Sequence, residues 1–334
     1  MKRFLLFFVS TIVALTSFSQ NEDVTKLHEN AKTFMRQGDY ANASIILVRA
    51  LQQEPDNIGV AKDLAFDYYL QKENTKALEV LKPFLEKKNA DDQSFQIAGI
   101  IYRATGDDKE AEKLYKKGIK SFPESGPLYN DYGELLWTRV NPEAIKLWEK
   151  GIQKDPDYPN NYYNACKYYY LTKDKIWSLL YGEIFINMEF NTARTAEIKN
   201  VLLDGYKKLF ADIDLMADTK DKNKFEIAFL STMNKQNSVV KNGINPESLA
   251  MIRTRFILDW SMINKNKFPF QLFSFQQKLM EEGIFPVYNQ WIFGAAQNLS
   301  AYQNWINTHG TEYAAFTKYR QDHLFKVPAN EYYH

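Results

Sequence analysis

Side chains that carry out enzyme chemistry are sparse in this sequence of 334 residues, and none has the spacing of a known catalytic or metal site. No two histidines share the spacing of a helical metal site, and no cysteine–histidine pair exists to bind zinc. Glu281 and Glu282 are adjacent, so on a helix their carboxylates point in different directions and form no acid–base pair. We therefore expect no catalytic residue and no metal site. The four histidines are His28, His309, His323 and His334.

Signatures of phosphate binding and of serine hydrolysis are also missing. The 14 glycines are scattered among turns, with neither the G-x-G-x-x-G of a dinucleotide site nor a P-loop. The Gly-x-Ser-x-Gly of many serine hydrolases is absent. We therefore expect no cofactor. One alternative stays open: the C-terminal half is an enzyme or ligand-binding domain, and its sign would be a deep pocket that combines His309 or His323 with carboxylates.

Four series of residues repeat at one interval through the first half of the chain. The helices that contain them determine where the side chains of a functional site would lie. Small residues form the first series, in steps of 34, 34, 34 and 33. A second small series and two series of large residues keep nearly the same step. A fixed period in this range is typical of stacked repeats, in which neighbouring units bury one continuous core. The series are Ala31, Ala65, Gly99, Gly133, Cys166; Ala43, Ala77, Ala111, Ala144; Phe34, Tyr68, Tyr102, Leu136, Tyr169; and Leu47, Leu81, Tyr115, Trp148.

Each unit has the pattern of two helices. In the first unit Leu27, Ala31 and Phe34 form one helical stripe, and Gly38 interrupts the pattern. A second stripe follows, which Pro55 ends. We expect the small residues where the two helices of a pair cross closely, and the large ones where a gap must be filled.

These residues resemble the tetratricopeptide repeat family. Its units combine a small residue and an aromatic in the first helix, a Gly-Asp turn, small residues around a large one in the second helix, and a closing proline. The resemblance covers roughly residues 24–190 and implies an all-α solenoid of about five helix pairs that binds protein or peptide partners. It also implies a first helix that lines the inner face of each unit. The lysine–asparagine clamp with which some members bind a C-terminal carboxylate is not reproduced, since His28 and Lys32 occupy its first two positions.

Two units depart from the family pattern at their turns, and a third departs in a helix. The second has Lys72 and Glu73 where a turn glycine is expected. The fourth is one residue short, and we expect Asn141 and Pro142 to make its turn. In the fifth unit, Gly182 stands where a large residue is expected.

The single cysteine, Cys166, holds the small-residue position of the fifth unit, so we expect a buried and inert thiol. A catalytic thiol needs a base nearby and some exposure, and no neighbouring residue in the sequence supplies the base. One cysteine also excludes an internal disulfide, so the fold must be stabilised by packing.

After about residue 190 the period is lost, but helical patterns continue and no alternating strand pattern competes with them. The second half is dense in aromatic residues, which at this density usually form a core. We expect a signal peptide at 1–19, a solenoid at 20–192, a capping helix and linker at 193–217 and a helical C-terminal domain at 218–334. The later helices are expected at 193–210, 225–234, 246–264, 271–282, 288–296, 300–308 and 311–323.

The N-terminus has the form of a secretory signal. Lys2 and Arg3 precede an apolar run of about 15 residues, which is short for a membrane span of roughly 20. We expect cleavage after Ser19, with an uncleaved anchor as the alternative, and no other stretch is long and apolar enough to cross a bilayer. The protein is then exported to the periplasm or associated with the outer membrane, with secretion as a further destination.

The charge of the processed chain excludes two classes of partner. With Lys2 and Arg3 removed, 40 basic residues face 41 acidic ones. Such a chain has no global electrostatic attraction for nucleic acid or for an anionic membrane. We therefore expect a protein or peptide partner and no nucleic acid.

The inner face of the solenoid is the one candidate binding site. Its basic residues outnumber the acidic ones, and aromatic residues alternate with them, which suits a segment carrying acidic and apolar side chains. The alternative is that the C-terminal half folds back and fills the groove. The candidate residues are Lys32, Arg36, Lys62, Phe66, Tyr69, Arg103, Trp137, Tyr163, Lys167 and Tyr170.

The leading hypothesis is therefore an exported, non-enzymatic interaction module or scaffold that binds a protein segment in the groove of its repeats. A subunit of an envelope secretion or motility complex is a second possibility. An enzymatic or ligand-binding C-terminal half, with the repeats as scaffold, is the third.

Overall fold

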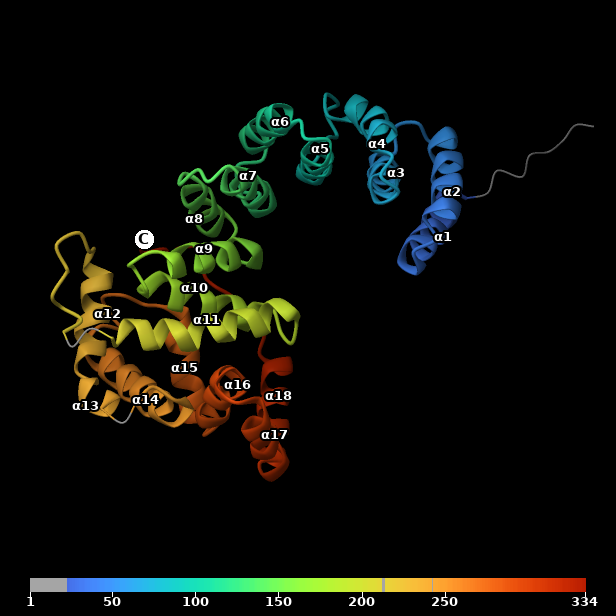
Figure 1. Ribbon diagram of the computed structural model, residues 1–334. Helices are drawn as coiled ribbons and strands as arrows, with labels where there is room; N and C mark the ends of the chain where they lie inside the picture. Colours follow the sequence, from blue (N-terminus) through green and yellow to red (C-terminus); the bar gives the residue numbers. More distant parts are fainter. Residues whose placement is uncertain (1–22, 212–213, 242) are drawn as a thin grey trace, which may run out of the picture. The chain divides into compact units, whose positions relative to one another are not determined.

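The computed structural model describes residues 23–211, 214–241 and 243–334, and within these ranges all regular secondary structure is helical (Figure 1). The expected all-α fold of consecutive helix pairs is confirmed. The signal peptide expected at residues 1–19 lies outside the described residues. The chain divides into two compact units, one ending at Pro83 and one beginning at Phe84, and each is described by itself.

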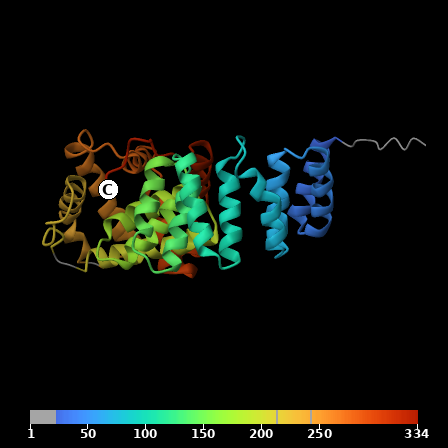
Figure 2. The same ribbon diagram turned by 90° about the horizontal axis from the view of Figure 1, so that it is seen from above.

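The first unit consists of two helix pairs that stand side by side (Figure 2, blue). Each helix contacts the next one along the chain, and the first helix of one pair also contacts the first helix of the other. The side chains between α1, α2 and α3 form a core of Val24, Leu27, Ala31, Leu47, Ala50, Val60 and Leu64. The helices are α1 Val24–Gln37, α2 Tyr40–Gln53, α3 Ile58–Leu70 and α4 Asn74–Leu81, followed by a 3-10 turn η1 Lys82–Phe84.

The second unit begins with three more helix pairs. Within each pair the helices are antiparallel neighbours, and the first helices of successive pairs contact one another: α5 contacts α7, and α7 contacts α9. Helix α11 packs on α10 and also reaches α9, as the first helix of a further pair would. These helices are α5 Asp92–Ala104, α6 Asp108–Ser121, α7 Gly126–Thr138, α8 Ala144–Lys154, α9 Pro159–Leu171, α10 Ile176–Met188 and α11 Ala193–Leu209.

Two of the repeated small residues, Gly99 and Gly133, lie where paired helices cross, and each faces a repeated large residue. A Cβ added to Gly99 would lie 2.3 Å from the ring of Tyr115, and one added to Gly133 would lie 2.4 Å from Nε1 of Trp148. No atom can sit that close, so only glycine allows α5 to approach α6, and α7 to approach α8, at these crossings. At these crossings, a residue of the first small series packs against a residue of the series Leu47, Leu81, Tyr115 and Trp148.

In the fifth pair the smaller residue at the crossing lies on the second helix instead of the first. Cys166 on α9 faces Gly182 on α10, where an added Cβ would lie 2.9 Å from the Cys166 sulfur. The glycine that departs from the family pattern therefore makes room for the larger residue opposite it. Helix α10 is buried along almost its whole length, because α9, α11 and α15 all pack on it.

The position of the left-handed residue between the two helices of a pair repeats at a constant interval, even where that residue is not glycine. Gly38, Lys72, Gly106 and Val140 all have positive φ, of 78°, 64°, 76° and 54°, and they are spaced by 34 residues. The fourth turn therefore bends at Val140, one residue before the expected Asn141. A residue that precedes proline is restricted to extended conformations, so Asn141 before Pro142 leaves the left-handed position to Val140.

Among the remaining helices of the second unit, α15 packs on α10 and α16 packs on α11, and the others pack on one another; α16 lies beside α11 in Figure 1. The expected helices are present, with shifts of up to three residues at their ends. The helix expected from Tyr288 begins at Phe285, because Pro286 lies in its first turn, where proline is favoured. They are α12 Lys224–Asn234, α13 Asn237–Val240, α14 Pro246–Ile263, α15 Gln271–Glu281, α16 Phe285–Gln297, α17 Leu299–Thr308 and α18 Gly310–Asp322.

Most of the aromatic residues of these helices form a core, as expected. Phe225 is nearly fully buried, and its ring lies 5.5 Å from Trp260 and 4.6 Å from Tyr333, measured between centroids. Helix α17 is different, because it carries no buried residue. Its Tyr302 and Trp305 stack on each other at the surface.

Candidate functional site

His309 and His323, which the sequence singles out for acid–base or metal chemistry, both stack on aromatic rings. His309 stacks on Trp305 at 4.6 Å, and His323 stacks on Tyr319 at 4.2 Å. Each ring also places its Nδ1 within hydrogen-bond distance of the carbonyl oxygen of its stacking partner. Across the described ranges, no group of three or more histidine, cysteine or acidic side chains is arranged to hold a metal ion.

Cys166 is fully buried between α9 and α10, as expected. Burial raises the pKa of its thiol to about 12, and the hydroxyl of Ser178, at 3.9 Å from the sulfur, only partly offsets this. A thiol in that state has almost no thiolate at neutral pH, so it is neither a nucleophile nor a metal ligand.

The candidate groove residues of the first unit lie at its surface, on α1 and α3. Lys32 pairs with Glu29 at 3.0 Å on the same helix, and Arg36 donates to the hydroxyl of Thr33 at 2.8 Å. The rings of Phe66 and Tyr69 stack with their centroids 5.9 Å apart, and Lys62 lies on the same helix, partly buried. His28 bridges the two helices through Asp63, with 2.6 Å between Nε2 and Oδ2.

In the second unit, polar side chains of α5, α7, α9 and α11 form a continuous series of contacts, which we call the ladder face. Its rungs join residues of successive first helices: Arg103 with Glu134 at 3.4 Å, and Asn164 with Asn130 at 2.9 Å. The outermost rungs join Tyr163 to Glu197 at 2.6 Å and Tyr170 to Asp204 at 2.7 Å. The ladder face comprises Arg103, Asn130, Glu134, Tyr163, Asn164, Lys167, Tyr170, Glu197 and Asp204.

The ladder face has no basic excess, since it carries two cations and three carboxylates. Lys167 pairs with Glu197 at 2.8 Å, and Arg103 with Glu134. Burial opposes ionisation of Glu197, but hydrogen bonds from Lys167 and Tyr163 lower its pKa. The expectation of a basic excess overlooked α11, which supplies both Glu197 and Asp204, because the periodic series end before this helix.

Trp137 supplies the aromatic element of this face. It lies one helical turn after Glu134 on α7, and its side chain is 40% exposed. The ring of Tyr168 meets it edge to face at 5.6 Å, and Trp148 lies behind it at 6.0 Å. An exposed indole held in place by two other rings is the kind of surface that provides most of the binding energy in protein interfaces.

A buried carboxyl group supports the ladder face from below. Asp131 is 5% exposed, and its Oδ1 accepts a hydrogen bond from Asn130 at 2.9 Å, whereas its Oδ2 is buried without a partner. Burial raises its pKa to about 6. The hydrogen bond from Asn130 to Asp131 fixes the amide of Asn130, so that its oxygen is the acceptor for Asn164.

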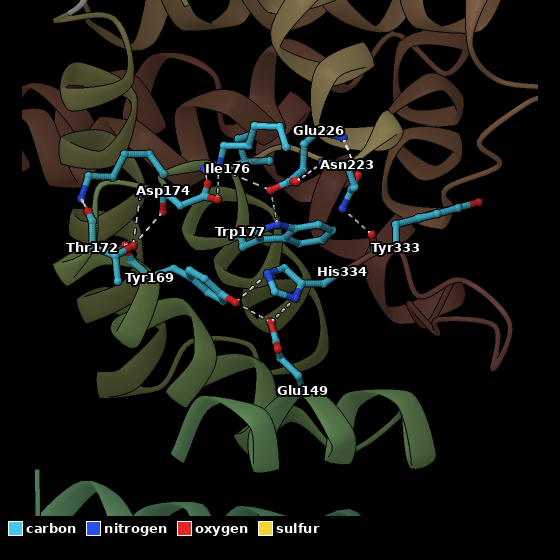
Figure 3. Close-up of polar contacts among 12 residues, drawn as sticks. Glu149, Tyr169, Thr172, Asp174, Ile176, Trp177, Asn223, Glu226, Tyr333 and His334 are labelled. Atoms are coloured by element: carbon cyan, nitrogen blue, oxygen red, sulfur yellow. Dashed lines mark hydrogen bonds and ion pairs between the residues drawn. The ribbon is translucent and has the colours of Figure 1, made fainter. Parts of the chain in front are cut away.

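The last residue of the chain binds to side chains of α8 and α9 that do not belong to the ladder face. Figure 3 shows the ring of His334 between Glu149 of α8 and Tyr169 of α9. His334 Nδ1 lies 2.9 Å from Glu149 Oε1, its Nε2 lies 2.7 Å from the Tyr169 hydroxyl, and that hydroxyl donates to the same Glu149 oxygen at 2.6 Å. Burial and the Glu149 carboxylate raise the pKa of Tyr169, which therefore stays protonated.

The ring of Trp177 on α10 joins this cluster to the C-terminal helices. Its edge-to-face contact with His334 measures 4.9 Å, and its Nε1 donates to Glu226 of α12 at 2.9 Å (Figure 3). Asn223 in turn donates to the carbonyl oxygen of Tyr333 at 2.8 Å. Tyr169 and His334 are separated by 165 residues, and no sequence signal points to these contacts.

A buried charge network fastens α10 to the C-terminal helices. Glu183 accepts hydrogen bonds from Arg253 of α14, from Gln276 of α15 at 2.5 Å and from Tyr288 of α16 at 2.8 Å. Arg253 and Glu183 are 2% and 3% exposed, and Arg253 also donates to Asn289 at 2.5 Å. Because all of its side chains are buried and bonded to one another, the network stabilises the fold and leaves no room for a substrate.

None of the helices in the described ranges has the length and apolar character needed to cross a membrane.

No family model matches the sequence, and no curated protein matches it. Solved structures with a similar fold include pilF of Pseudomonas aeruginosa, 15% identical, with 61% of this chain and 94% of that chain covered and a TM-score of 0.47. A thermophilic TPR protein of Thermus thermophilus is 15% identical, with 54% and 99% covered and a TM-score of 0.46. The C-terminal part of a TPR repeat-containing protein of Cytophaga hutchinsonii is 15% identical, with 72% and 90% covered and a TM-score of 0.44.

Proposed function

Because the helix pairs are of the tetratricopeptide type, we propose that this protein is a non-enzymatic interaction module that binds a segment of another protein along the ladder face. The observation that carries the proposal is Trp137, an indole that is 40% exposed beside a row of hydrogen-bonding side chains. In contrast, Trp148, Trp177, Trp260 and Trp291 are buried. Trp137 is thus the tryptophan of the described residues whose ring is most accessible to a partner.

The composition of the ladder face defines the partner. Its carboxylates and cations are already paired, so a strongly charged segment gains little there. The amides of Asn130 and Asn164 and the hydroxyl of Tyr163 can exchange their mutual hydrogen bonds for bonds to a peptide backbone. We therefore propose a segment of low net charge with one aromatic or large apolar side chain that packs on Trp137 and Tyr168.

The proposal is supported by where the contacts of this face lead. The ring and hydrogen-bond contacts of Trp137, Tyr163 and Tyr170 are made with α8, α9, α10 and α11. The C-terminal segment instead binds at Glu149 and Tyr169. The aromatic C-terminal helices form their own core, which argues against the alternative that they fill the groove.

Selection of a random peptide display library on the full chain tests the proposal. A peptide selected this way should bind the Trp137→Ala variant at least about tenfold more weakly than the wild type, because an exposed indole of this kind is a hot spot. The matched control is Trp305→Ala, which removes a partly exposed tryptophan from α17 and should leave the affinity unchanged. Equal binding to wild type and Trp137→Ala would reject the ladder face as the site.

Export is a separate part of the proposal and rests on the sequence of residues 1–19. Cell fractionation with mass measurement of the protein tests it: the chain should lie outside the cytoplasm and lack these residues. A full-length cytoplasmic chain would contradict it without touching the proposal for the ladder face.

A further inference from the structure

Two cations share one buried indole ring in the second unit. Lys199 Nζ of α11 lies 3.8 Å from the ring centroid of Trp291, and the guanidinium of Arg320 of α18 lies 4.5 Å from it. Arg320 donates to the carbonyl oxygens of Ile186 and Asn187, but its Nη1 is buried without a partner. In the part of the chain that the structure describes, no carboxylate lowers the energy of either charge.

The lysine is the member of this pair that can relieve the repulsion. Burial lowers the pKa of Arg320 only to about 10, so the guanidinium keeps its charge at neutral pH. Burial and the charge of Arg320 lower the pKa of Lys199 to about 7. Arg320 also lies over the ring of Phe190, at 4.1 Å from its centroid, whereas Trp291 is the aromatic ring that Lys199 contacts. The amine can lose its proton, whereas the guanidinium cannot. Lys199 therefore has a large neutral fraction under conditions where an ordinary lysine is fully protonated.

A cavity lies beside Lys199, and this residue forms part of its lining. It measures about 330 Å³ and lies between the first turns of α11 and the end of α16. Thr195, Ala196 and Lys199 line one side, and Ala295 and Ala296 line the other. This volume is at the lower end of ordinary ligand pockets, so it suits a small molecule. Lys199 is the one charged residue among those that line it.

We propose that Lys199 is a nucleophilic amine that captures a small aldehyde in this cavity as an imine. The lone pair of Nζ forms a bond to the carbonyl carbon, while the C=O π pair moves to oxygen and takes up a proton. Loss of water then forms the C=N bond, and neither an oxidant nor a reductant is consumed. A carbonyl compound needs the neutral amine, whereas an anion would meet a single, partly protonated cation. The inference does not depend on partner binding at the ladder face.

Reductive alkylation of the full chain with acetaldehyde and cyanoborohydride tests the proposal. The modified peptides are quantified by mass spectrometry between pH 6 and pH 10. At pH 7, Lys199 should react at least about tenfold faster than Lys150, an exposed lysine of α8, because its amine is largely neutral. Its rate should fall below pH 7, with a midpoint near that value. A Lys199 that reacts no faster than Lys150, or whose midpoint lies above pH 9, would overturn the proposal.

Two variants distinguish an amine whose protonation is shifted by its surroundings from one that is only exposed to solvent. Arg320→Gln removes the second cation, so the midpoint of the Lys199 profile should move to higher pH and its rate at pH 7 should fall. Ala296→Phe narrows the cavity, so the rate should fall while the midpoint stays in place. A lysine that is only exposed would respond to neither change, and that result would also reject the proposal. If Arg320→Gln does not fold by circular dichroism, the wild-type profile and Ala296→Phe decide the matter.

Discussion

The Oδ1 atom of Asn130 accepts a hydrogen bond from Asn164 Nδ2 at 2.9 Å, and the two residues are 34 positions apart. Tyr163 and Glu197 have the same separation, as do Tyr170 and Asp204. The repeat period is therefore visible twice, in the buried small residues and in the polar contacts between neighbouring first helices. Substitution of one rung changes the surroundings of the equivalent residue in the next unit.

We predict that Val140→Gly stabilises the second unit. Val140 has a φ of 54° and is 86% exposed, so its side chain contributes almost no packing while its Cβ makes the left-handed turn unfavourable. The free energy of unfolding should rise by about 1 kcal/mol. Urea unfolding followed by tryptophan fluorescence measures the change, since Trp137 and Trp148 lie on the two helices that this turn joins. Val140→Ala keeps the Cβ and is the control; an equal gain in that variant would contradict the explanation.

We predict that Asp67→Asn stabilises the first unit at neutral pH. Asp67 is fully buried, one of its oxygens has no partner, and the burial raises its pKa to about 6, with Gln71 as its hydrogen-bond donor at 2.7 Å. Because the folded state holds the proton more tightly than the unfolded state, stability falls as pH rises from about 4 to about 6. Above pH 6 the variant should be more stable by about 2 kcal/mol, since asparagine carries no charge.

Amide hydrogen exchange of α1 and α3 peptides, corrected for intrinsic rates, measures this effect, because the first unit contains no tryptophan. The protection of the wild type should decline between pH 4 and pH 6, whereas that of Asp67→Asn should stay level. Asp63→Asn, a substitution of a partly exposed aspartate on the same helix, is the control. Parallel declines in the wild type and Asp67→Asn would show that Asp67 is not the titrating group.

We predict that Arg253→Met severely destabilises the second unit and that Arg253→Met/Glu183→Leu recovers much of the loss. The single substitution leaves the Glu183 carboxylate buried without its counter-ion, at a cost of about 3–5 kcal/mol. The double substitution removes both charges from the core. The exposed Arg255 lies on the same helix, so Arg255→Met is the control and should change stability little. Denaturant unfolding distinguishes the three; a double variant no more stable than Arg253→Met would contradict the account.

We predict that the thiol of Cys166 does not react with a disulfide reagent such as DTNB in the native protein and reacts fully in denaturant. The sulfur is buried, and burial raises its pKa to about 12, so both access and thiolate are lacking. Thr138→Cys, which introduces a thiol at an exposed position, should add one rapidly reacting group in the folded state. Native reactivity of Cys166 at a similar rate would show that α9 and α10 open readily at their crossing.

The periodic residues predict the repeats well because their cause is local and recurs. Gly99 opposite Tyr115 and Gly133 opposite Trp148 each satisfy the same geometric need, one unit apart. The turn at Val140 was misplaced by one residue, since residue type suggested Asn141 while the restriction imposed by Pro142 moved the bend.

The candidate site was only partly predictable. Tyr163, Lys167 and Tyr170 do lie together on the ladder face, but their partners Glu197 and Asp204 belong to a helix in which the series of small residues has ended. The contacts of His334 join residues far apart in the sequence without any period, so pattern analysis had no means of finding them. The expected basic excess is absent from this face because Glu197 and Asp204 add two carboxylates that the periodic series do not include.

The position of His334 restricts how the number of repeats can change. A stacked array gains or loses whole units easily where each unit contacts only its neighbours. Here one imidazole touches Glu149 on α8, Tyr169 on α9 and Trp177 on α10, so a duplicated unit inserted among these helices would pull its three contacts apart. An insertion or loss of a unit before α8 leaves these three contacts in place.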